Sequence, residues 1–217
     1  MDKKVELIGQ DNQMELFRLE TEPFGTNTYI VLCRDSGEGV LIDTPGNPEI
    51  IKEKLKNTRV KYILMTHGHM DHIMALKELY AALDAPLAVH EGDAGKLPVK
   101  ADTLLKDGNT IKCGKLKLEV IHTPGHTPGS LCFRVGKYLL SGDTIFPGGP
   151  GKTGTPRDFQ QIFASIKENI LTLPDETVIL AGHGDATTLE KERKLIEAFS
   201  SRVHSDDLCG DVTWEKS

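Results

Sequence analysis

Apolar residues in the first third of the chain gather in short runs that glycine and proline residues separate. These runs are rich in Leu, Ile, Val and aromatic side chains, which is the pattern of consecutive antiparallel strands. The predicted strands cover residues 14–20, 27–33 and 39–43. Apolar positions at Ile50, Ile51 and Leu55 have helical spacing and predict a helix over 48–56. The run that follows, 60–65, predicts a fully buried strand.

The remainder of the chain alternates between predicted helices and predicted strands. Helices are expected over 73–83, 157–171 and 187–203, and strands over 86–90, 116–122, 130–135, 137–141 and 177–181. The polar stretch 91–108 predicts a loop with at most a short helix, and the Gly- and Pro-rich stretch 147–156 predicts a second loop. Strands in groups with helices between them indicate the α/β class, here two packed sheets flanked by helices in a four-layer αββα sandwich. We expect one domain over 1–217, with 204–217 as a polar C-terminal tail.

Composition and charge narrow the classes of protein to consider. The 217 residues are 38% hydrophobic and 27% charged, as in an ordinary globular protein. The formal net charge of -6 argues against a nucleic-acid or anionic-membrane partner, because such proteins gather Lys and Arg to meet phosphate charge. No apolar stretch has the character of a secretory signal or the ~20 residues of a membrane span, so a cytoplasmic location is expected. The four cysteines form no Cys-x-x-Cys pair, and nothing in the sequence indicates the oligomeric state.

Histidine and aspartate residues are concentrated at one point of the chain. Three of the eight histidines fall, with an aspartate, within the segment Thr66-His67-Gly68-His69-Met70-Asp71-His72. This segment directly follows the predicted strand 60–65 and therefore lies at the carboxyl end of a strand, where α/β sheets place their ligand sites. Imidazole nitrogen and carboxylate oxygen are ligands of Zn²⁺ and of other first-row divalent metals, and short spacing on a turn lets four side chains converge. The segment therefore predicts a metal site.

Three later segments have the same character. They are His122-Thr123-Pro124-Gly125-His126-Thr127-Pro128-Gly129-Ser130, Ser141-Gly142-Asp143-Thr144-Ile145-Phe146 and Ala181-Gly182-His183-Gly184. With these four ordered motifs, which span 66–184, the chain resembles the metallo-β-lactamase superfamily, and it looks closest to the glyoxalase II-like branch of thioester hydrolases. The resemblance implies the αββα fold and the hydrolysis of a small-molecule substrate at a centre of two divalent metal ions.

The same resemblance assigns a role to each of the ligand residues. It implies that the first metal ion is held by His67, His69 and His126. It implies that the second is held by Asp71, His72 and His183. Asp143 matches the family's bridging aspartate, since one carboxylate has two oxygens and can serve two cations. Zn²⁺ is the expected metal, with Fe and Mn as alternatives, and a hydroxide between the ions is expected to attack the substrate carbonyl while Asp71 orients the water.

Other activities stay open at this point. Persulfide dioxygenases share the fold and the motifs but hold one ferrous ion with two histidines and a carboxylate, which here are His67, His126 and Asp143. A complete second ligand set favours a hydrolase, of which a lactonase or another ester hydrolase is a further alternative. A β-lactamase is disfavoured because Asp143 stands where the first subclass of zinc β-lactamases carries cysteine, and a nuclease is disfavoured because the chain is acidic. A structural zinc site is disfavoured because such sites fill four positions with Cys and His.

The sequence says less about substrate recognition than about the metal site. Lys152 and Arg157 flank the loop that follows Asp143 and are candidate contacts for an acidic group of the substrate. Full-length glutathione-thioester hydrolases carry a C-terminal helical extension with basic residues for the glutathione carboxylates, whereas 34 residues follow His183 here. This difference argues against glutathione recognition.

Polar residues next to the ligands are candidates for supporting roles. Thr66, Thr127 and Ser130 are placed to hydrogen-bond ligand imidazoles or to cap turns. His122 precedes His126 on a stretch that runs from a strand into a loop, so its spacing does not bring the two rings to one face. We expect His122 to have a structural role or to support a ligand residue from outside the metal site.

Overall fold

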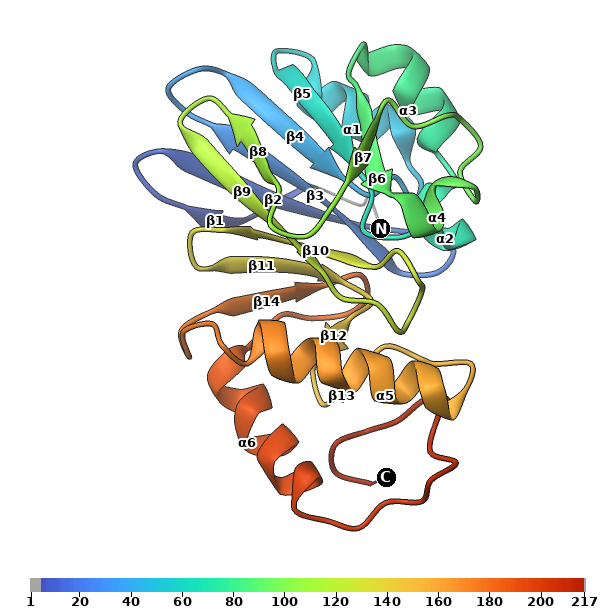
Figure 1. Cartoon of the computed structure of the whole chain (residues 1–217). Coiled ribbons are helices and arrows are strands. Elements are labelled where there is room, and N and C mark those ends of the chain that lie inside the picture. The colour runs from blue at the N-terminus through green and yellow to red at the C-terminus, as the bar shows by residue number, and fades with distance from the viewer. Residues whose placement is uncertain (1–4, 217) are drawn as a thin grey trace.

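Two β-sheets lie face to face in this protein, and helices cover the outer side of each sheet (Figure 1). The structure is a computed structural model and describes residues 5–216. Within these residues, the first sheet holds seven strands in chain order: β1 (Glu6–Gln10), β2 (Met14–Thr21), β3 (Thr26–Cys33), β4 (Glu38–Ile42), β5 (Arg59–Leu64), β6 (Leu87–His90) and β7 (Thr103–Leu105). The second sheet holds six, in the order β15 (Thr187–Thr188), β14 (Val178–Ala181), β11 (Tyr138–Gly142), β10 (Leu131–Val135), β9 (Leu116–His122) and β8 (Thr110–Cys113). A short pair, β12 (Ile145–Phe146) and β13 (Gly149–Pro150), follows β11 in the chain.

The helices occupy the two outer layers. The first sheet is covered by α1 (Pro48–Leu55) and α3 (Leu76–Leu83), and the second by α5 (Pro156–Ser165) and α6 (Leu189–Ser200) (Figure 1). The helix α5 continues as a π-helical turn, η1 (Ile166–Ile170), and two single-turn helices, α2 (Met70–Ile73) and α4 (Glu91–Ala94), follow β5 and β6 in the chain. Among residues 5–216, no helix combines the length and apolar character that crossing a membrane requires.

The core consists of three apolar layers that follow from the alternation of side chains along the strands. On β3, Tyr29 and Val31 point between the two sheets, whereas Ile30 points toward α1 and α3. On β11, Leu140 points between the sheets and Leu139 points toward α5 and α6. Both sheets are therefore buried on both faces, which explains the long apolar runs in their central strands. The predicted four-layer αββα sandwich is confirmed.

The structure differs from the sequence-based prediction mainly in its shorter elements. The sequence predicts no strand at β1, β7, β8, β12, β13 or β15. The predicted loop 91–108 contains α4 and β7, the predicted loop 147–156 contains β13, and the helix expected over 187–203 is α6, which begins after β15 and ends at Ser200. With three residues, of which one is buried, β7 is too short for an alternating pattern to mark it. The helix expected over 73–83 is preceded by a separate turn, α2, and the helix expected over 157–171 changes to π-helical hydrogen bonding after Ser165.

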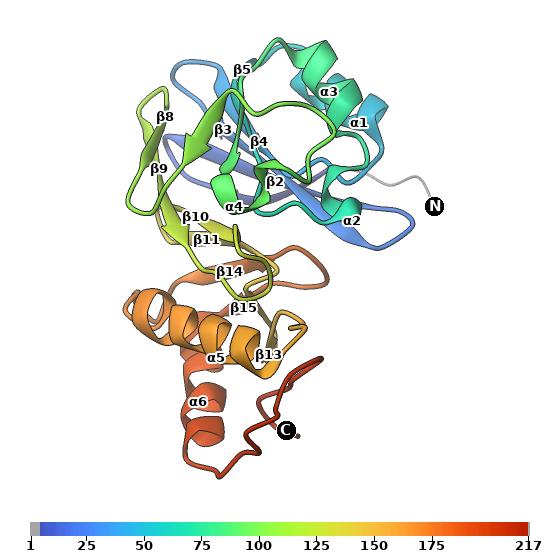
Figure 2. The ribbon, with the colours of Figure 1, turned by 45° about the vertical axis from the view of Figure 1, so that its right-hand side comes forward.

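The segment after α6 folds back onto the protein in place of the expected polar tail. Its backbone pairs with the loop before α5: Thr153 N–H donates to Gly210 O over 3.2 Å, and Gly210 N–H donates to Thr153 O over 3.0 Å. Trp214 N–H donates to Gly148 O over 2.8 Å. Figure 2 shows this segment returning to the side of β13. Val212 and Trp214 are buried, so two apolar residues anchor a segment whose composition is otherwise polar.

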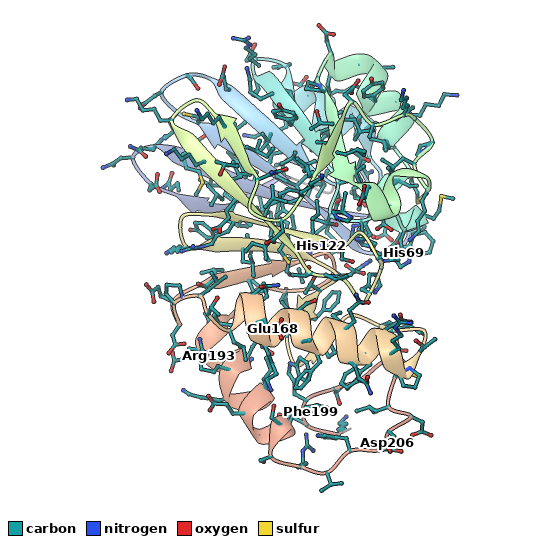
Figure 3. All side chains as sticks on the ribbon, viewed as in Figure 1. His69, His122, Glu168, Arg193, Phe199 and Asp206 are labelled. Carbon is teal, nitrogen blue, oxygen red and sulfur yellow. The ribbon has the colours of Figure 1, made fainter. Side chains whose placement is uncertain are left out.

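We expect that Trp214→Ala lowers the free energy of unfolding by about 3–5 kcal/mol, the usual cost of deleting a buried aromatic side chain. The Trp214 ring lies 5.3 Å from that of Phe199 and 6.0 Å from that of Phe163, and Figure 3 shows Phe199 between α6 and the C-terminal segment. Urea unfolding followed by circular dichroism measures the change. Val203→Ala, at a fully exposed position, is the control and should change the stability by less than about 0.5 kcal/mol. Equal stability of both variants would show that Trp214 does not anchor the segment.

Candidate metal centre

Four strands direct their following loops to one edge of the sandwich. One is β5 of the first sheet, and the others are β9, β11 and β14 of the second, which run parallel to one another because β10 is antiparallel to both β9 and β11. The segments that follow the carboxyl ends of these strands carry all the predicted ligands: His67, His69, Asp71 and His72 after β5, His126 after β9, Asp143 after β11 and His183 after β14. Figure 3 shows His69 at this edge. The site lies where α/β sheets commonly place ligands.

Three histidines form a first group. The ring nitrogens of His67, His69 and His126 that face this group lie within 4.8 Å of one another. The closest pair is His126 Nε2 and His69 Nδ1, at 2.9 Å. Burial lowers the pKa of His67 well below its usual value and also lowers the pKa of His69. Both rings are therefore neutral at pH 7 and present the lone pairs that a divalent cation takes.

Asp71, His72 and His183 form a second group. Nε2 of His183 lies 3.0 Å from Asp71 Oδ2, and Nε2 of His72 lies 3.8 Å from the same oxygen. The first residue of β3 supports this group, because the Thr26 hydroxyl donates to Asp71 Oδ2 over 3.4 Å and the Thr26 backbone forms an isolated bridge with His183. A carboxylate and two imidazoles thus converge beside the first group.

Asp143 lies between the two groups. Its Oδ1 is 3.4 Å from His72 Nε2, and its Oδ2 is 3.5 Å from His126 Nε2 and 3.7 Å from His183 Nε2. One carboxylate therefore faces ligand candidates of both groups, which is the arrangement expected of a residue shared by two cations.

Unpartnered polar atoms show that the cluster fits a metal. Within residues 5–216, the buried atoms His67 Nε2, His72 Nε2 and Asp143 Oδ1 have no hydrogen-bond partner. Leaving buried polar atoms unpaired costs about 1–3 kcal/mol each, and more for a charged group. Nitrogen and carboxylate oxygen that converge in this way are the donor set of divalent cations, and cations bound at the two groups would satisfy these atoms.

Four of the five histidine rings have a partner at Nδ1 that orients the imidazole; they are those of His67, His72, His126 and His183. Nδ1 of His72 donates to Asp43 Oδ2 over 2.8 Å, Nδ1 of His126 donates to Lys152 O over 2.8 Å, and Nδ1 of His183 donates to Phe24 O over 3.3 Å. Nδ1 of His67 lies 3.1 Å from the Thr66 hydroxyl. Thr66 therefore contacts a ligand imidazole, as the sequence suggested it could. Nε2 of all four rings is thereby turned toward the centre.

Asp43 is a supporting residue that the sequence analysis missed. It follows β4, is buried, and accepts from Thr66 N–H over 2.8 Å and from the Thr66 hydroxyl over 2.7 Å, besides its bond to His72. Its φ of 58° lies in the left-handed region, which turns the carboxylate toward the loop after the neighbouring strand β5. An acidic residue at the end of an apolar strand is the signal that marks it in the sequence.

Asp93 is a second supporting residue that the sequence analysis missed. It lies on α4 with no exposed surface, and its Oδ2 accepts from Gly68 N–H over 3.0 Å and from the Thr127 hydroxyl over 2.6 Å. One carboxylate therefore joins the loop that carries His67 and His69 to the loop that carries His126. Gly129 permits this contact, because a Cβ at that position would come within 2.7 Å of the Asp93 nitrogen.

Thr127 and Ser130 act on the loop rather than on a ring. Thr127 N–H donates to the Ser130 hydroxyl over 3.1 Å, and the two hydroxyls lie 2.8 Å apart. His122 keeps the structural role expected of it: its ring stacks on that of His90 with centroids 3.9 Å apart, and its Nε2 donates to Pro128 O over 3.0 Å.

The two groups of ligand candidates differ in how their histidines are protonated. Burial acts to lower the pKa of His72, but the facing carboxylates of Asp43 and Asp143 outweigh it and raise that pKa to about 10. The hydrogen bond from His183 lowers the pKa of Asp71 to about 2 and raises the pKa of His183. Without a cation, the second group therefore carries protons that a cation would displace.

A cavity of about 340 Å³ opens beside the cluster. His126, Asp143 and His183 form its floor, and its walls come from the β12–β13 loop, Lys152 and the C-terminal segment. Of the two predicted substrate contacts, Lys152 lines this cavity and pairs with Asp211 at 3.1 Å. The other, Arg157, lies exposed in the first turn of α5 and is not part of the cavity wall.

The fold and the cluster together define an α/β sandwich protein with a metal site rich in histidine and aspartate. The sequence model described as the metallo-beta-lactamase superfamily matches residues 21–183, a range that includes every ligand candidate. The chain therefore belongs to the metallo-β-lactamase superfamily.

Individual relatives agree with this assignment. The hydroxyacylglutathione hydrolase GloC of Haemophilus influenzae is 32% identical over 183 residues, which cover 74% of this chain and 86% of that protein. The crystal structure of BLEG-1, a B3 metallo-β-lactamase, superimposes with a TM-score of 0.74 and 30% identity, covering 82% of this chain and 96% of that one. TTHA1623, crystallised in a di-iron-bound form, superimposes with a TM-score of 0.71 and 31% identity, covering 82% and 97%. The predicted superfamily is confirmed, and a metal-dependent hydrolase is the class of enzyme that these relatives support.

We expect that Asp93→Asn weakens metal binding about tenfold, because loss of a residue that positions ligands commonly costs ten- to a hundredfold in affinity. The amide keeps the volume but loses the charge that accepts from Gly68 and Thr127. Competition with a chromophoric chelator measures the dissociation constant of Zn²⁺. Asp102→Asn is the control, since Asp102 also accepts from a backbone N–H, that of Leu87 over 2.8 Å, but away from the ligand loops. Equal affinity of the two variants would contradict the role of Asp93.

We expect metal binding to release close to one proton from His72 near pH 7. With its pKa raised to about 10, the ring is protonated there in the metal-free protein, and a cation at Nε2 displaces that proton. The share of the release that comes from His72 should fall away as the pH rises above 10, and the total near pH 7 should be smaller in Asp43→Asn, which removes a carboxylate that raises the pKa of His72. Calorimetric titration with Zn²⁺ in buffers of different ionisation enthalpy counts the protons. Binding heats independent of the buffer near pH 7 would show that His72 is already neutral.

Proposed function

We propose that this protein is a binuclear metal-dependent hydrolase that cleaves thioesters. The position of Asp143 carries the proposal, because its two oxygens face His72 of one group at 3.4 Å and His126 of the other at 3.5 Å. The proposed ligands are His67, His69 and His126 for one ion, Asp71, His72 and His183 for the other, and Asp143 for both. Zn²⁺ is the proposed metal, with Fe and Mn as alternatives. The di-iron form of TTHA1623 supports a site for two ions.

The proposed reaction is the addition of water to a thioester carbonyl. Two divalent cations held by these residues would supply Lewis acidity and lower the pKa of water, as one zinc ion alone does from roughly 15.7 to about 7. The water oxygen forms a bond to the carbonyl carbon and the proton of the water passes to solvent, while the carbon–sulfur bond breaks and the thiolate leaves with the bonding electrons. A thiolate leaves more readily than an amine, so the reaction needs no strong acid in the cavity.

Asp71 is the proposed catalytic residue that orients the water. Its pKa of about 2 keeps the carboxylate ionised throughout the neutral range, so it accepts a hydrogen bond from water and does not supply a proton. The Thr26 hydroxyl donates to Oδ2 of this carboxylate over 3.4 Å. With metal bound, His183 Nε2 would be a ligand and no longer donate to Asp71, so Thr26 and the cation would hold the carboxylate before substrate arrives, which is the condition for effective orientation.

Thioesters are proposed as the substrates because of the similarity to GloC, which is named as a hydroxyacylglutathione hydrolase. Lys152 is the proposed contact for a polar group of the substrate, since it lines the cavity beside the cluster. Arg157 is not proposed as a contact because it lies outside the cavity wall. The second ligand group distinguishes this proposal from the mononuclear iron dioxygenase, which needs only His67, His126 and Asp143.

The test combines metal analysis with an assay under nitrogen. We expect about two metal ions per chain and cleavage of S-D-lactoylglutathione that does not consume oxygen, with Asp143→Ala losing both turnover and metal. About one iron per chain, with oxygen uptake on glutathione persulfide, would favour the dioxygenase. Full activity of Asp143→Ala would contradict the binuclear arrangement. Faster cleavage of a β-lactam or a lactone than of any thioester would replace the proposed substrate class.

A further inference from the structure

The wall of the cavity carries opposite charges side by side. Among the wall residues that the structure describes, Lys152 carries the positive charge and Asp211 the negative charge, with Lys152 Nζ 3.1 Å from Asp211 Oδ2. Phe146, Pro147 and Val212 supply apolar surface to the same cavity. Apart from the metal cluster, the wall therefore carries one charge of each sign and no net charge.

The backbone brings the two charged residues together. Thr153 and Gly210 form a bridge with a hydrogen bond in each direction, so the residues directly before and after them, Lys152 and Asp211, are neighbours. The Lys152 carbonyl accepts from His126 Nδ1 over 2.8 Å, which ties the same backbone to a ligand candidate. The pair is thus placed by main-chain contacts on both sides, although its side chains are 69% and 78% exposed.

We propose that Asp211 sets the charge selectivity of the cavity by neutralising Lys152. With Asp211 present, Lys152 is already paired and a carboxylate on the acyl chain of a substrate also meets the repulsion of Asp211. The cavity therefore takes thioesters with uncharged acyl groups in preference to those that end in a carboxylate. This inference rests on the proposed thioester hydrolysis and adds to it the class of acyl group.

Replacing Asp211 with a neutral residue makes the cavity wall more positive. A neutral residue at this position leaves Lys152 free to pair with a substrate carboxylate and removes a repulsive charge. Because both partners are largely exposed, water and salt screen the effect, and exposed ion pairs are worth only a few-fold in an equilibrium constant. We therefore expect a modest change in selectivity between the two kinds of acyl group, and this change should decrease as the salt concentration rises.

The experiment compares two acyl thioesters of one uncharged thiol, S-butyryl- and S-succinyl-N-acetylcysteamine, which differ in a terminal methyl or carboxylate group. The quantity measured is the ratio of kcat/KM for the succinyl to that for the butyryl compound, after subtraction of the uncatalysed rates. We expect a ratio below one for the wild-type enzyme and a rise of about fivefold in Asp211→Asn at low salt. The rise should largely disappear near 1 M salt, where the screening length is about 3 Å.

Two further variants show whether Lys152 carries the effect. The double variant Lys152→Met, Asp211→Asn should return the ratio to within about twofold of the wild-type value. Asp35→Asn removes an acid from another exposed ion pair, Asp35 with Lys115 at 2.8 Å, and controls for the change in net charge. Its ratio should equal that of the wild type.

The outcomes separate the two proposals. Cleavage of both thioesters with an unchanged ratio in Asp211→Asn overturns the role of Asp211 and leaves the hydrolase intact. A rise that persists in the double variant overturns the role of Lys152 and with it the neutralised pair. Failure of the metal-loaded enzyme to cleave these thioesters and S-D-lactoylglutathione counts against thioester hydrolysis itself, and the inference about acyl groups then falls with it.

Discussion

Packing the two sheets face to face is the constraint on which the metal centre depends. The first ligand group takes His67 and His69 from the loop after β5 and His126 from the loop after β9, so it joins the two sheets. The second group does the same, with Asp71 and His72 from the first sheet and His183 from the second. Neither group is complete within one sheet. The apolar layer between the sheets therefore stabilises the fold and holds the ligand geometry at the same time.

Two buried carboxylates hold the loop after β5 in place. Asp43 and Asp93 are charged groups with almost no exposed surface, and burying a charge is costly unless hydrogen bonds compensate. Each accepts a backbone N–H from the loop after β5, Asp43 from Thr66 and Asp93 from Gly68. Charge-assisted hydrogen bonds of this kind are among the stronger ones in proteins. The loop that carries four ligand candidates is thus held from two sides by side chains that themselves face no substrate.

Much of this organisation could be predicted from the sequence, and the parts that could not share a physical reason. The apolar runs of the central strands, grouped with helices between them, indicate the sandwich, and the cluster from His67 to His72 indicates the centre because several ligand candidates are close together in the chain. The hydrogen bond from the Thr127 hydroxyl to the Asp93 carboxylate joins residues 34 positions apart, and nothing in the local pattern of either residue marks it. The burial of Trp214 likewise depends on aromatic rings of α5 and α6 that only the tertiary structure brings near. Local sequence patterns therefore indicate the helices, the strands and the ligand candidates. Contacts between residues far apart in the chain decide which polar residues hold the ligand candidates in place.

The return of the C-terminal segment to the cavity separates the wall of the site from the part of the fold that gathers the ligand candidates. Asp211 and Val212 line the cavity, whereas every ligand candidate precedes this segment in the chain. The segment rests on the buried side chains of Val212 and Trp214, and segments with few buried contacts open locally at a lower free-energy cost than the packed core. A local opening of this segment would widen the cavity without separating the two sheets that bring the ligand candidates together.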